Sequence, residues 1–486
     1  MNIYDPIFYW GRVAPNRAAC AFPGGTVTYS QLCNGADAAA VAFQRKGFRQ
    51  NELVNVAVVN PVFQLMVLLA LGRIGAGAAM FDPNNLGAVG STPIHGLITD
   101  DPQFPWPTGK RKFITDHKWF TARLGEENPQ RIAPYAVAPD DLLRIVTTSG
   151  ATGSSKGVAL THRMVEARLR TACLQPESRR VLSMVAPKAS WGYLNALKVL
   201  RAGGTYCLAP FPDQCLELCD AFGVEVICAS VAQIASLVGE QRKKQRELPL
   251  LRSILLGGSI VAPGLISDVQ RVICKNVSIG YGASEVGQIA AAPVSLLQHN
   301  PGAVGFIYPG AKVEIVDGSH RLMAPERVGT IRMRSDGSST GYLNKSEDAE
   351  GVFTDGWFYP GDRGLLTRDG LLVVEGRTSE LVLNKGGLKL NPANIEDKLL
   401  HASDVVDAGV VAGESENGAP EIWAAIVTSP GPFNIDVFKK KMEDLLGAFA
   451  PDRYFTVDAI PRNDAGKVQY KLLRDKLSVA ANKANH

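Results

Sequence analysis

One segment of the chain combines glycines, hydroxyl side chains and a lysine in a pattern that suits phosphate binding. Residues 147–157 read Thr-Thr-Ser-Gly-Ala-Thr-Gly-Ser-Ser-Lys-Gly. The glycines let the backbone approach a ligand closely, while hydroxyl and backbone N–H groups can surround phosphate oxygens and Lys156 adds a positive charge. The segment is not a P-loop, because Gly157 rather than Ser or Thr follows the lysine. The candidate phosphate contacts are Thr148, Ser149, Gly150, Thr152, Gly153 and Lys156.

Five later segments place further polar side chains beside glycines or prolines. They are Tyr-Gly-Ala-Ser-Glu at 281–285, Gly-Trp-Phe-Tyr-Pro-Gly-Asp at 356–362, Gly-Arg at 376–377, Asn-Lys-Gly-Gly at 384–387 and Pro-Arg-Asn-Asp-Ala-Gly-Lys at 461–467. Taken singly, Tyr281 could be a core residue, Asp362 a turn residue and Lys467 a surface charge. A lone run of glycine and serine is also more often a flexible surface loop than a binding site. The order of these segments along the chain is what gives them a chemical meaning.

Taken together in this order, the segments resemble the motifs of the acyl-adenylate-forming superfamily, which includes acyl- and aryl-CoA ligases, the adenylation domains of peptide synthetases and firefly luciferases. The resemblance runs from about residue 27 to residue 473 and is closest to the acyl- and aryl-CoA ligases. It implies an AMP-forming acid–thiol ligase that uses ATP, Mg²⁺ and coenzyme A. The carboxylate of an aryl or short- to medium-chain aliphatic acid would first attack the α-phosphate of ATP. A thiol would then displace AMP from the acyl-adenylate.

The resemblance also implies roles for individual residues. The loop at 147–157 would hold the β- and γ-phosphates, and Ser284 would bond the α-phosphate. Glu285 would help to hold Mg²⁺ through its oxygen atoms, as hard cations prefer. Lys467 would stabilise the charge that grows at the reacting carboxylate, so Lys467, Ser284 and Glu285 form the predicted catalytic set. The other predicted nucleotide contacts are Gly258, Ser259 and Tyr281 at the adenine, Asp362 and Arg377 at the ribose, and Gly282.

The resemblance places the acid pocket around residues 190–196, 230–231, 258 and 282–289. Its candidate substrate contacts are Trp191, Tyr193 and Gly287. For the two aromatic side chains, plain core packing is an equal alternative. Members of the superfamily that activate amino acids place an Asp in the first stretch, but no Asp occurs from residue 183 to residue 200. Because a buried ammonium without a partner is costly, we expect an acid without an α-amino group.

Two alternatives to a CoA ligase stay open. The thiol could belong to the phosphopantetheine of a carrier protein, although no carrier domain is fused here. The chain could also be a non-catalytic homologue that binds acyl-adenylates. The presence of both Glu285 and Lys467 argues against that second alternative.

Composition and charge exclude several other classes of protein. The 486 residues carry 51 Lys and Arg against 47 Asp and Glu, and a net charge of +4 is too small a bias to predict a nucleic-acid partner. The eight cysteines show no CxxC spacing and are expected to be reduced and buried. The longest apolar stretch, residues 65–71, reads as a buried helix that is too short to span a membrane. No signal peptide is visible, so we expect a cytoplasmic location.

The elements that must position these motifs follow from the apolar pattern. Short apolar runs such as 53–59 and 181–185 alternate with helical patterns through the first half of the chain, which predicts parallel βα units. Short β-rich stretches after residue 302 predict a β subdomain. The expected fold class is therefore α/β. A large AMP-binding N-terminal domain is predicted over residues 1–378 and a small mobile α+β C-terminal domain over residues 379–486, with a hinge near Ser379.

Overall fold

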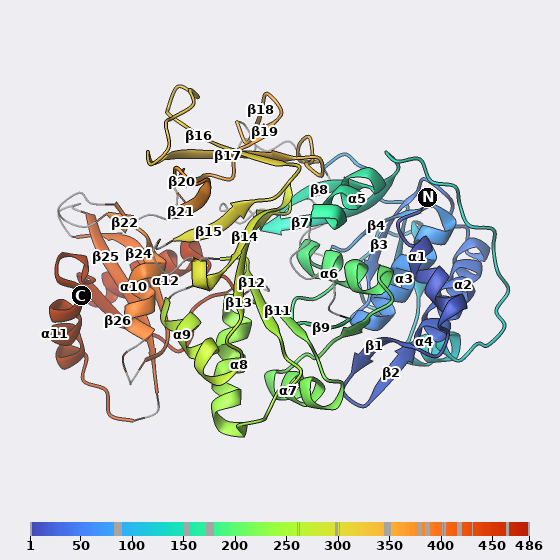
Figure 1. Cartoon of the computed structure of the whole chain (residues 1–486), viewed down its shortest axis with the longest axis horizontal. Coiled ribbons are helices and arrows are strands. Elements are labelled where there is room, and N and C mark those ends of the chain that lie inside the picture. Colours follow the sequence, from blue (N-terminus) through green and yellow to red (C-terminus); the bar gives the residue numbers. More distant parts are fainter. Residues whose placement is uncertain are drawn as a thin grey trace.

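The computed structural model of the chain describes most of the sequence. The described residues are 2–81, 90–149, 155–171, 179–259, 261, 263–296, 300, 302–344, 351–377, 382–383, 389–400, 402, 405–415, 420–429, 431–462 and 466–484. The N- and C-terminal ends lie at opposite ends of the longest axis (Figure 1). Among the described residues, no helix is both long and apolar enough to cross a membrane.

The larger of two central sheets has 15 strands in the order β18-β19-β17-β20-β21-β15-β14-β13-β12-β11-β9-β10-β1-β2, with β16 paired to β17. Its middle, from β1 through β10, β9, β11 and β12 to β13, is parallel. The parallel strands are β1 (Ala18–Phe22), β9 (Arg180–Ser183), β10 (Thr205–Cys207), β11 (Val226–Ser230), β12 (Ser253–Gly257) and β13 (Val277–Ala283). The antiparallel strands are β2 (Gly25–Thr28), β14 (Gly287–Pro293), β15 (Ala303–Ile307), β16 (Ala311–Val316), β17 (Gly329–Ser335), β18 (Phe353–Thr354), β19 (Trp357–Phe358), β20 (Asp362–Leu366) and β21 (Leu371–Arg377).

Helices connect the parallel strands, as the alternating pattern predicts. They are α6 (Ser190–Arg201), α7 (Pro212–Ala221), α8 (Val231–Lys244) and α9 (Pro263–Val272). Helix α8 begins at a capping box, in which the Ser230 side chain accepts from the Gln233 backbone and the Gln233 side chain accepts from the Ser230 backbone. The predicted β-rich region after residue 302 is present, but it continues the large sheet through the pairing of β14 with β15. It does not form a sheet of its own.

A second sheet of six strands lies beside the first, in the order β6-β5-β3-β4-β7-β8. Only its last pair, β7 with β8, is antiparallel. Its strands are β3 (Leu53–Ala57), β4 (Gly77–Ala79), β5 (Gly96–Thr99), β6 (Arg111–Ile114), β7 (Leu142–Ser149) and β8 (Ser155–Thr161). The helices of this region are α1 (Asp5–Val13), α2 (Tyr29–Arg45), α3 (Pro61–Ile74), α4 (His117–Leu124) and α5 (His162–Thr171).

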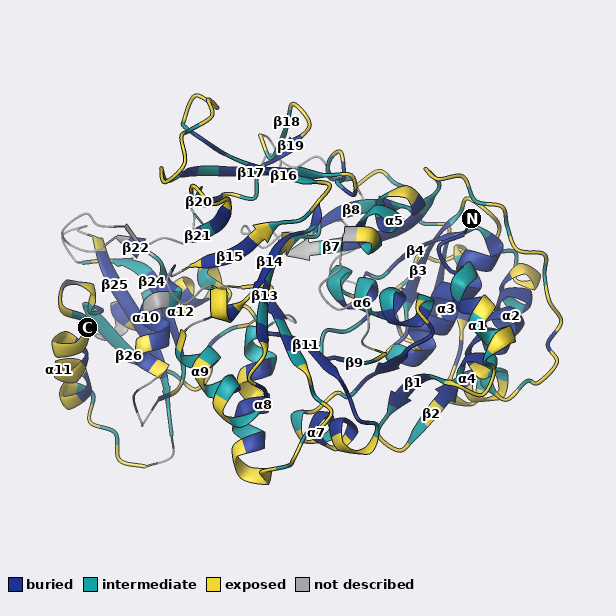
Figure 2. Ribbon diagram, in the orientation of Figure 1, coloured by how far each residue is buried: buried dark blue, intermediate teal, exposed yellow. Residues whose placement is uncertain are grey.

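Helix α3 shows how the core of this region is built. Asn60 caps its N-terminus, Pro61 occupies the first turn and Gly75 ends it in the left-handed region, so the local sequence sets both ends. Every residue from 62 to 74 is buried, as Figure 2 shows for the ribbon, which confirms the predicted buried helix. The one charge in this stretch, Arg73, is compensated by Asp37 at 2.8 Å.

The last part of the chain forms a smaller group of elements, which we call the C-terminal unit and which comprises residues 382–484. Its three-stranded sheet has the order β24-β25-β26, and two clusters of buried side chains there draw only on this unit. Its elements are β22 (Val382–Leu383), β23 (Lys389–Leu390), α10 (Pro392–Leu400), β24 (Val405–Glu414), β25 (Pro420–Thr428), α11 (Ile435–Leu446), β26 (Arg453–Thr456) and α12 (Tyr470–Ala484). Short 3₁₀ helices occur at η2 (Val294–Leu296) and η4 (Gly447–Phe449). The predicted hinge, Ser379, lies outside the described residues, and the domain boundary and the mobility stay predictions.

Candidate active site

The predicted phosphate loop is the tip of the β7–β8 hairpin. Pairing reaches past the expected end of the strand, because Thr147 lies opposite Gly157 and Thr148 opposite Lys156. The side chains of Thr148 and Ser149, together with Gly150, Thr152 and Gly153, lie outside the described residues. Lys156 is only 7% exposed, and its Nζ lies 5.1 Å from the centroid of the Tyr342 ring. A cation–π contact therefore holds the lysine next to the tip of the hairpin.

Glu285 lies in the turn between β13 and β14 and is buried. Its Oε1 accepts a hydrogen bond of 2.6 Å from the Tyr342 hydroxyl. Its backbone carbonyl accepts from the backbone N–H of Ser339 at 2.7 Å and from Nη2 of Arg168 at 3.1 Å. Burial and the charge of Glu285 raise the pKa of Tyr342, so this phenol stays a donor and leaves the carboxylate as acceptor. Tyr342 therefore contacts both the predicted metal ligand, Glu285, and the predicted phosphate contact, Lys156.

Asp362, Tyr281 and Arg377 come together at the predicted ribose site. Asp362 begins β20 opposite Arg377 at the end of β21, and Nε of Arg377 lies 3.5 Å from Oδ1 of Asp362. The Tyr281 hydroxyl donates to Oδ2 of Asp362 at 2.6 Å. Burial and the negative charge of Asp362 raise the pKa of Tyr281 well above its usual value. A carboxylate offers about four lone-pair positions, so Asp362 can accept further donors beside these two.

Lys467 of the C-terminal unit and Trp191 of helix α6 both lie close to the glycine turn that follows β12. Gly258 has φ +92°, and a Cβ built on it would lie 4.0 Å from Cε of Lys467. A Cβ on the preceding residue, Gly257, would lie 3.4 Å from the Trp191 ring. The candidate catalytic lysine and one candidate acid contact therefore meet at the same turn. Ser259, the predicted adenine neighbour, follows in this turn and is exposed.

The turn from Tyr281 to Gly287 is tightly folded. A Cβ on Gly282 would overlap the carbonyl oxygen of Gly287, and Gly287 itself has φ +82°. A Cβ on Gly287 would lie 3.0 Å from Cγ of Arg168. Ser284, the predicted α-phosphate contact, is half-buried in the same turn. These glycines allow the tight turn that carries Ser284 and Glu285.

Tyr193 lies apart from the other predicted site residues. Its side chain is fully buried in the core, its hydroxyl lies 2.7 Å from that of Tyr4, and the Arg144 guanidinium lies 4.2 Å from its ring centroid. Two residues along a helix turn by about 200°, so Trp191 and Tyr193 of α6 cannot face the same side. Trp191 faces the glycine turn, and a contact between Tyr193 and the acid is therefore no longer part of the proposed site.

Sequence reasoning missed three residues that hold the site together. Tyr342 links Glu285 and Lys156, as described above. Arg168 of α5 bonds the carbonyl oxygens of Glu285 and Gly337, the latter at 2.9 Å. Arg144 of β7 donates from Nη2 to the carbonyls of Pro187 and Lys188, which precede α6. None of them belongs to a glycine-rich motif, so nothing in the sequence indicated that they contribute to the site.

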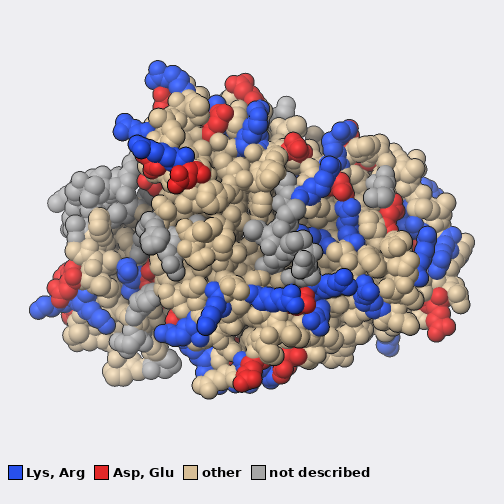
Figure 3. All heavy atoms as spheres, viewed as in Figure 1, with Lys and Arg blue, Asp and Glu red and all other residues tan. Residues whose placement is uncertain are grey.

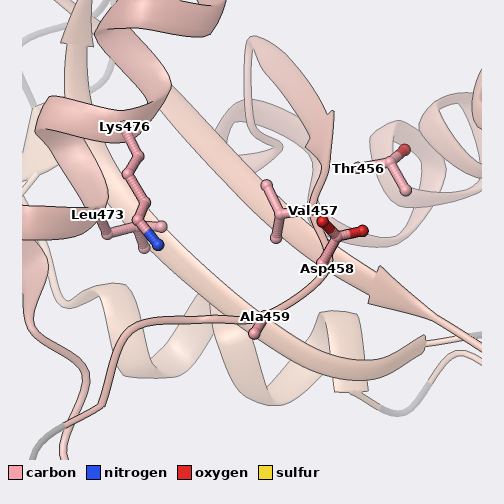
Figure 4. Close-up of a pocket in the computed structure, with 6 residues that line it drawn as sticks. All are labelled: Thr456, Val457, Asp458, Ala459, Leu473 and Lys476. Atoms are coloured by element: carbon pink, nitrogen blue, oxygen red, sulfur yellow. The ribbon is translucent and has the colours of Figure 1, made fainter.

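A surface hollow of about 370 Å³ lies elsewhere, in the C-terminal unit. Figure 4 shows its lining, which comes from the end of β26, the following loop and α12. The lining residues are Thr456, Val457, Asp458, Ala459, Leu473 and Lys476. None of the predicted site residues is among them.

The fold and the meeting of these motifs define the class of protein. Residues 7–343 match the AMP-binding enzyme family, and the chain belongs to this family. The match confirms the resemblance that the motifs indicate, and with it the expectation of an enzyme.

Relatives of known activity match along much of the chain. An indoleacetate–CoA ligase from Aromatoleum aromaticum is 28% identical over 492 residues, which covers 94% of each chain. The fatty acid–[acyl-carrier-protein] ligase ScoC from Streptomyces coeruleorubidus is 28% identical over 71% of this chain and 69% of its own. The solved structure of o-succinylbenzoate CoA synthetase from Bacillus subtilis, in complex with its acyl-adenylate, superposes with a TM-score of 0.83 at 22% identity, covering 97% of this chain and 98% of that one. This structural likeness confirms the α/β fold.

Proposed function

We propose that the chain activates a carboxylic acid with ATP to an acyl-adenylate and then transfers the acyl group to the thiol of coenzyme A. The observation that carries the proposal is the meeting of Lys467 with the glycine turn after β12, next to Trp191. The residue before this turn, Gly257, pairs with Gly280, which precedes Tyr281, and Tyr281 bonds Asp362, a carboxylate suited to the ribose. Glu285 and Lys156, which are suited to Mg²⁺ and phosphate, are both buried and are linked through Tyr342. Relatives that are named as CoA ligases support the acceptor.

In the first step, an oxygen of the acid's carboxylate attacks the α-phosphorus of ATP, and the bond to the bridging oxygen of pyrophosphate breaks. Lys467 would lie beside the reacting oxygens and stabilise their growing negative charge. Lys156 would bind the phosphates that leave, and Asp362 would hold the ribose through charge-assisted hydrogen bonds. These contacts orient the two substrates, which can supply much of the rate enhancement.

The residues present fit a magnesium ion that arrives with the nucleotide. Mg²⁺ is usually bound through one or two carboxylates together with substrate phosphates, and Glu285 offers a buried carboxylate of which Tyr342 takes only one position. When bound, the ion would spread the negative charge of the phosphates. The role of the chain is to hold Glu285 in place through Tyr342, Ser339 and Arg168.

In the second step, the sulfur of the thiol attacks the acyl carbon, and AMP leaves with the electrons of the broken C–O bond. A carrier-protein phosphopantetheine is the second candidate acceptor, because ScoC, which is named for such a substrate, is also 28% identical to this chain, over 71% of its residues. We place the enzyme in the cytoplasm. The seven cysteines that the structure describes are free and buried, which is in keeping with a reducing compartment.

The proposal predicts AMP and pyrophosphate as the products formed from ATP. Purified protein is incubated with Mg²⁺, α-labelled ATP and a panel of aryl and aliphatic acids, with and without CoA, and the labelled nucleotides are separated. We expect AMP to appear with an accepted acid and to need Mg²⁺. ADP as the product would rule out adenylation. Exchange of pyrophosphate into ATP without any thiol-dependent AMP release would point to the carrier-protein acceptor.

We also predict that the accepted acid lacks an α-amino group. The stretch leading into and through α6 has no Asp to pair with an ammonium, and Trp191 presents an apolar face at the glycine turn. An unpaired buried charge of this kind is strongly unfavourable. ATP–pyrophosphate exchange is measured with matched pairs, such as phenylacetate against phenylalanine. Exchange with amino acids but with none of the simple acids would overturn this prediction.

A further inference from the structure

The hairpin that carries Lys467 is braced from within the C-terminal unit. Arg462 and Val468 form an antiparallel bridge, and the backbone N–H of Gln469 donates to the carbonyl of Pro461 at 2.8 Å. Across this hairpin, Nη1 of Arg462 donates to the carbonyl oxygen of Gly466 at 2.8 Å. Gly466 directly precedes the lysine. The arginine therefore fixes the peptide unit from which the Lys467 side chain starts.

Arg462 is itself fixed by Asp407 of β24. Nε of Arg462 lies 3.2 Å from Oδ2 of Asp407, and Nη2 lies 2.6 Å from Oδ1. Two parallel bonds of this kind define the orientation of the guanidinium plane as well as its position. Oδ1 of Asp407 also accepts from the backbone N–H of Ala408 at 2.9 Å, which orients the carboxylate. A chain of hydrogen bonds thus runs from β24 to the residue before Lys467.

The tip of this hairpin touches the part of the chain that binds the nucleotide. Gly466 has φ +75°, and a Cβ on it would overlap the Cβ of Ala232 in α8. Lys467 then reaches the turn at Gly258. Because the approach is so close, a small rotation of the peptide at residue 466 would move the ammonium group away from the reacting atoms.

Stabilisation of the fold does not by itself account for the Arg462–Asp407 pair. Its side chains are 30% and 29% exposed, so solvent screens the pair and limits its contribution to folding stability. The groups that the pair bonds, the carbonyl of Gly466 and the backbone N–H of Ala408, lie within the C-terminal unit, so the brace does not depend on how this unit is docked. A role in directing Lys467 explains why the third nitrogen of the guanidinium points at the carbonyl of Gly466.

We propose that Arg462, oriented by Asp407, is a positioning residue that presents Lys467 for the adenylation step. This inference rests on the proposed function, since it needs Lys467 to act on the acid and ATP. Arg462 itself does not contact the reacting atoms in this proposal. It acts only through the hairpin, so its loss affects the step that uses Lys467 and spares the step that does not.

The test compares the two half-reactions in Arg462→Met, Arg462→Lys and Asp407→Asn. The matched control is Arg321→Met, because Arg321 also pairs with an aspartate, Asp317, at 2.9 Å but lies in the β-rich region away from the hairpin. ATP–pyrophosphate exchange reports adenylation, and thioester formation from presynthesised acyl-adenylate reports the second step. Thermal unfolding of each variant reports the fold.

We expect Arg462→Met to lower kcat of exchange by about 10- to 100-fold, as small misplacements of a catalytic group do, with the KM for ATP nearly unchanged. Thioester formation and the melting temperature should stay close to those of the unchanged enzyme. Arg462→Lys should restore part of the exchange rate. Asp407→Asn should lower it as well, and combining it with Arg462→Met should add little, because the two residues act as one unit.

Two results would overturn the positioning role. Unchanged exchange in Arg462→Met, in an enzyme that is otherwise active, would show that the hairpin needs no brace. Equal losses in both half-reactions together with a lowered melting temperature would make the pair structural. If the unchanged enzyme formed no acyl-adenylate with any acid, the proposed function itself would be wrong. That result is distinct from a failure of the positioning role, which would appear only as a difference between the variants and an active unchanged enzyme.

Discussion

Replacing Lys467 with alanine is expected to lower the rate of acyl-adenylate formation by about 10²–10³-fold, the usual cost of losing one positioned charge contact in the transition state. Thioester formation from presynthesised acyl-adenylate should continue at a nearly normal rate. The structure places Cε of Lys467 4.0 Å from where a Cβ on Gly258 would lie, which is the turn that Trp191 also faces. This is the position that the proposed first half-reaction requires of the lysine.

The expected separation of the two half-reactions rests on a predicted movement of the C-terminal unit. We propose that this unit rotates after adenylation, which would carry Lys467 away and bring the loop at Gly386-Gly387, which lies outside the described residues, toward the thiol. Single-turnover kinetics of each half-reaction measure the effect. Lys476→Ala is the matched control, because Lys476 is an exposed lysine of the same unit that lines the surface hollow. Equal damage to both half-reactions by Lys467→Ala would count against the rotation.

Replacing Asp362 with alanine is expected to raise the KM for ATP by roughly 10- to 100-fold. The two ribose hydroxyls would lose a shared charged acceptor, and one charged hydrogen bond contributes about 1.5–3 kcal/mol. The buried carboxylate lies between Tyr281 and Arg377, at the ends of two paired strands. Its removal leaves the backbone pairing of β20 with β21 in place, so the fold should persist.

Two further variants separate ribose binding from local packing. Tyr281→Phe removes the hydroxyl that donates to Asp362 but keeps the carboxylate, so its effect on the KM for ATP should be much smaller. Asp369→Ala, in the exposed turn before β21, serves as a control for loss of an aspartate in this region. Steady-state kinetics with varied ATP and calorimetric titration with ATP give the two measurements. An unchanged KM in Asp362→Ala would make this residue a turn aspartate only.

The parts of the fold that depend on local pattern could be predicted from the sequence. Helix α3 is the clearest case, because Asn60, Pro61 and Gly75 mark its ends and its apolar residues leave no polar face. The alternation of strands and helices from β9 to β13 follows the same logic. The continuity of the β-rich region with the large sheet could not be predicted, because it depends on the pairing of β15 both with its neighbour in sequence, β14, and with β21, which is far away in sequence.

The candidate site shows the same division. Asp362 and Tyr281 could be named from their motifs, but their hydrogen bond joins residues 81 positions apart, and nothing local specifies it. Tyr342 had no motif at all. For Tyr193 the helical period was available in the sequence and would have separated it from Trp191. The division into two domains at residue 378, the mobility of the second and the individual residue roles stay predictions.

The separation of the site between two sheets has a consequence for how such an enzyme can diversify. The proposed phosphate hairpin belongs to the six-stranded sheet, whereas Trp191 stands on a helix that connects strands of the 15-stranded sheet. Arg144 of the six-stranded sheet donates to the backbone carbonyls of Pro187 and Lys188, which precede that helix, and its guanidinium lies 4.2 Å from the ring centroid of Tyr193 on the helix. Under the proposed function, mutations at half-buried positions of α6 that face the glycine turn, as Trp191 does, are expected to change the contacts with the acid while the proposed nucleotide contacts on other elements stay in place. Selection for a new substrate can then act on helix α6 while the elements that carry the proposed ATP contacts stay unchanged.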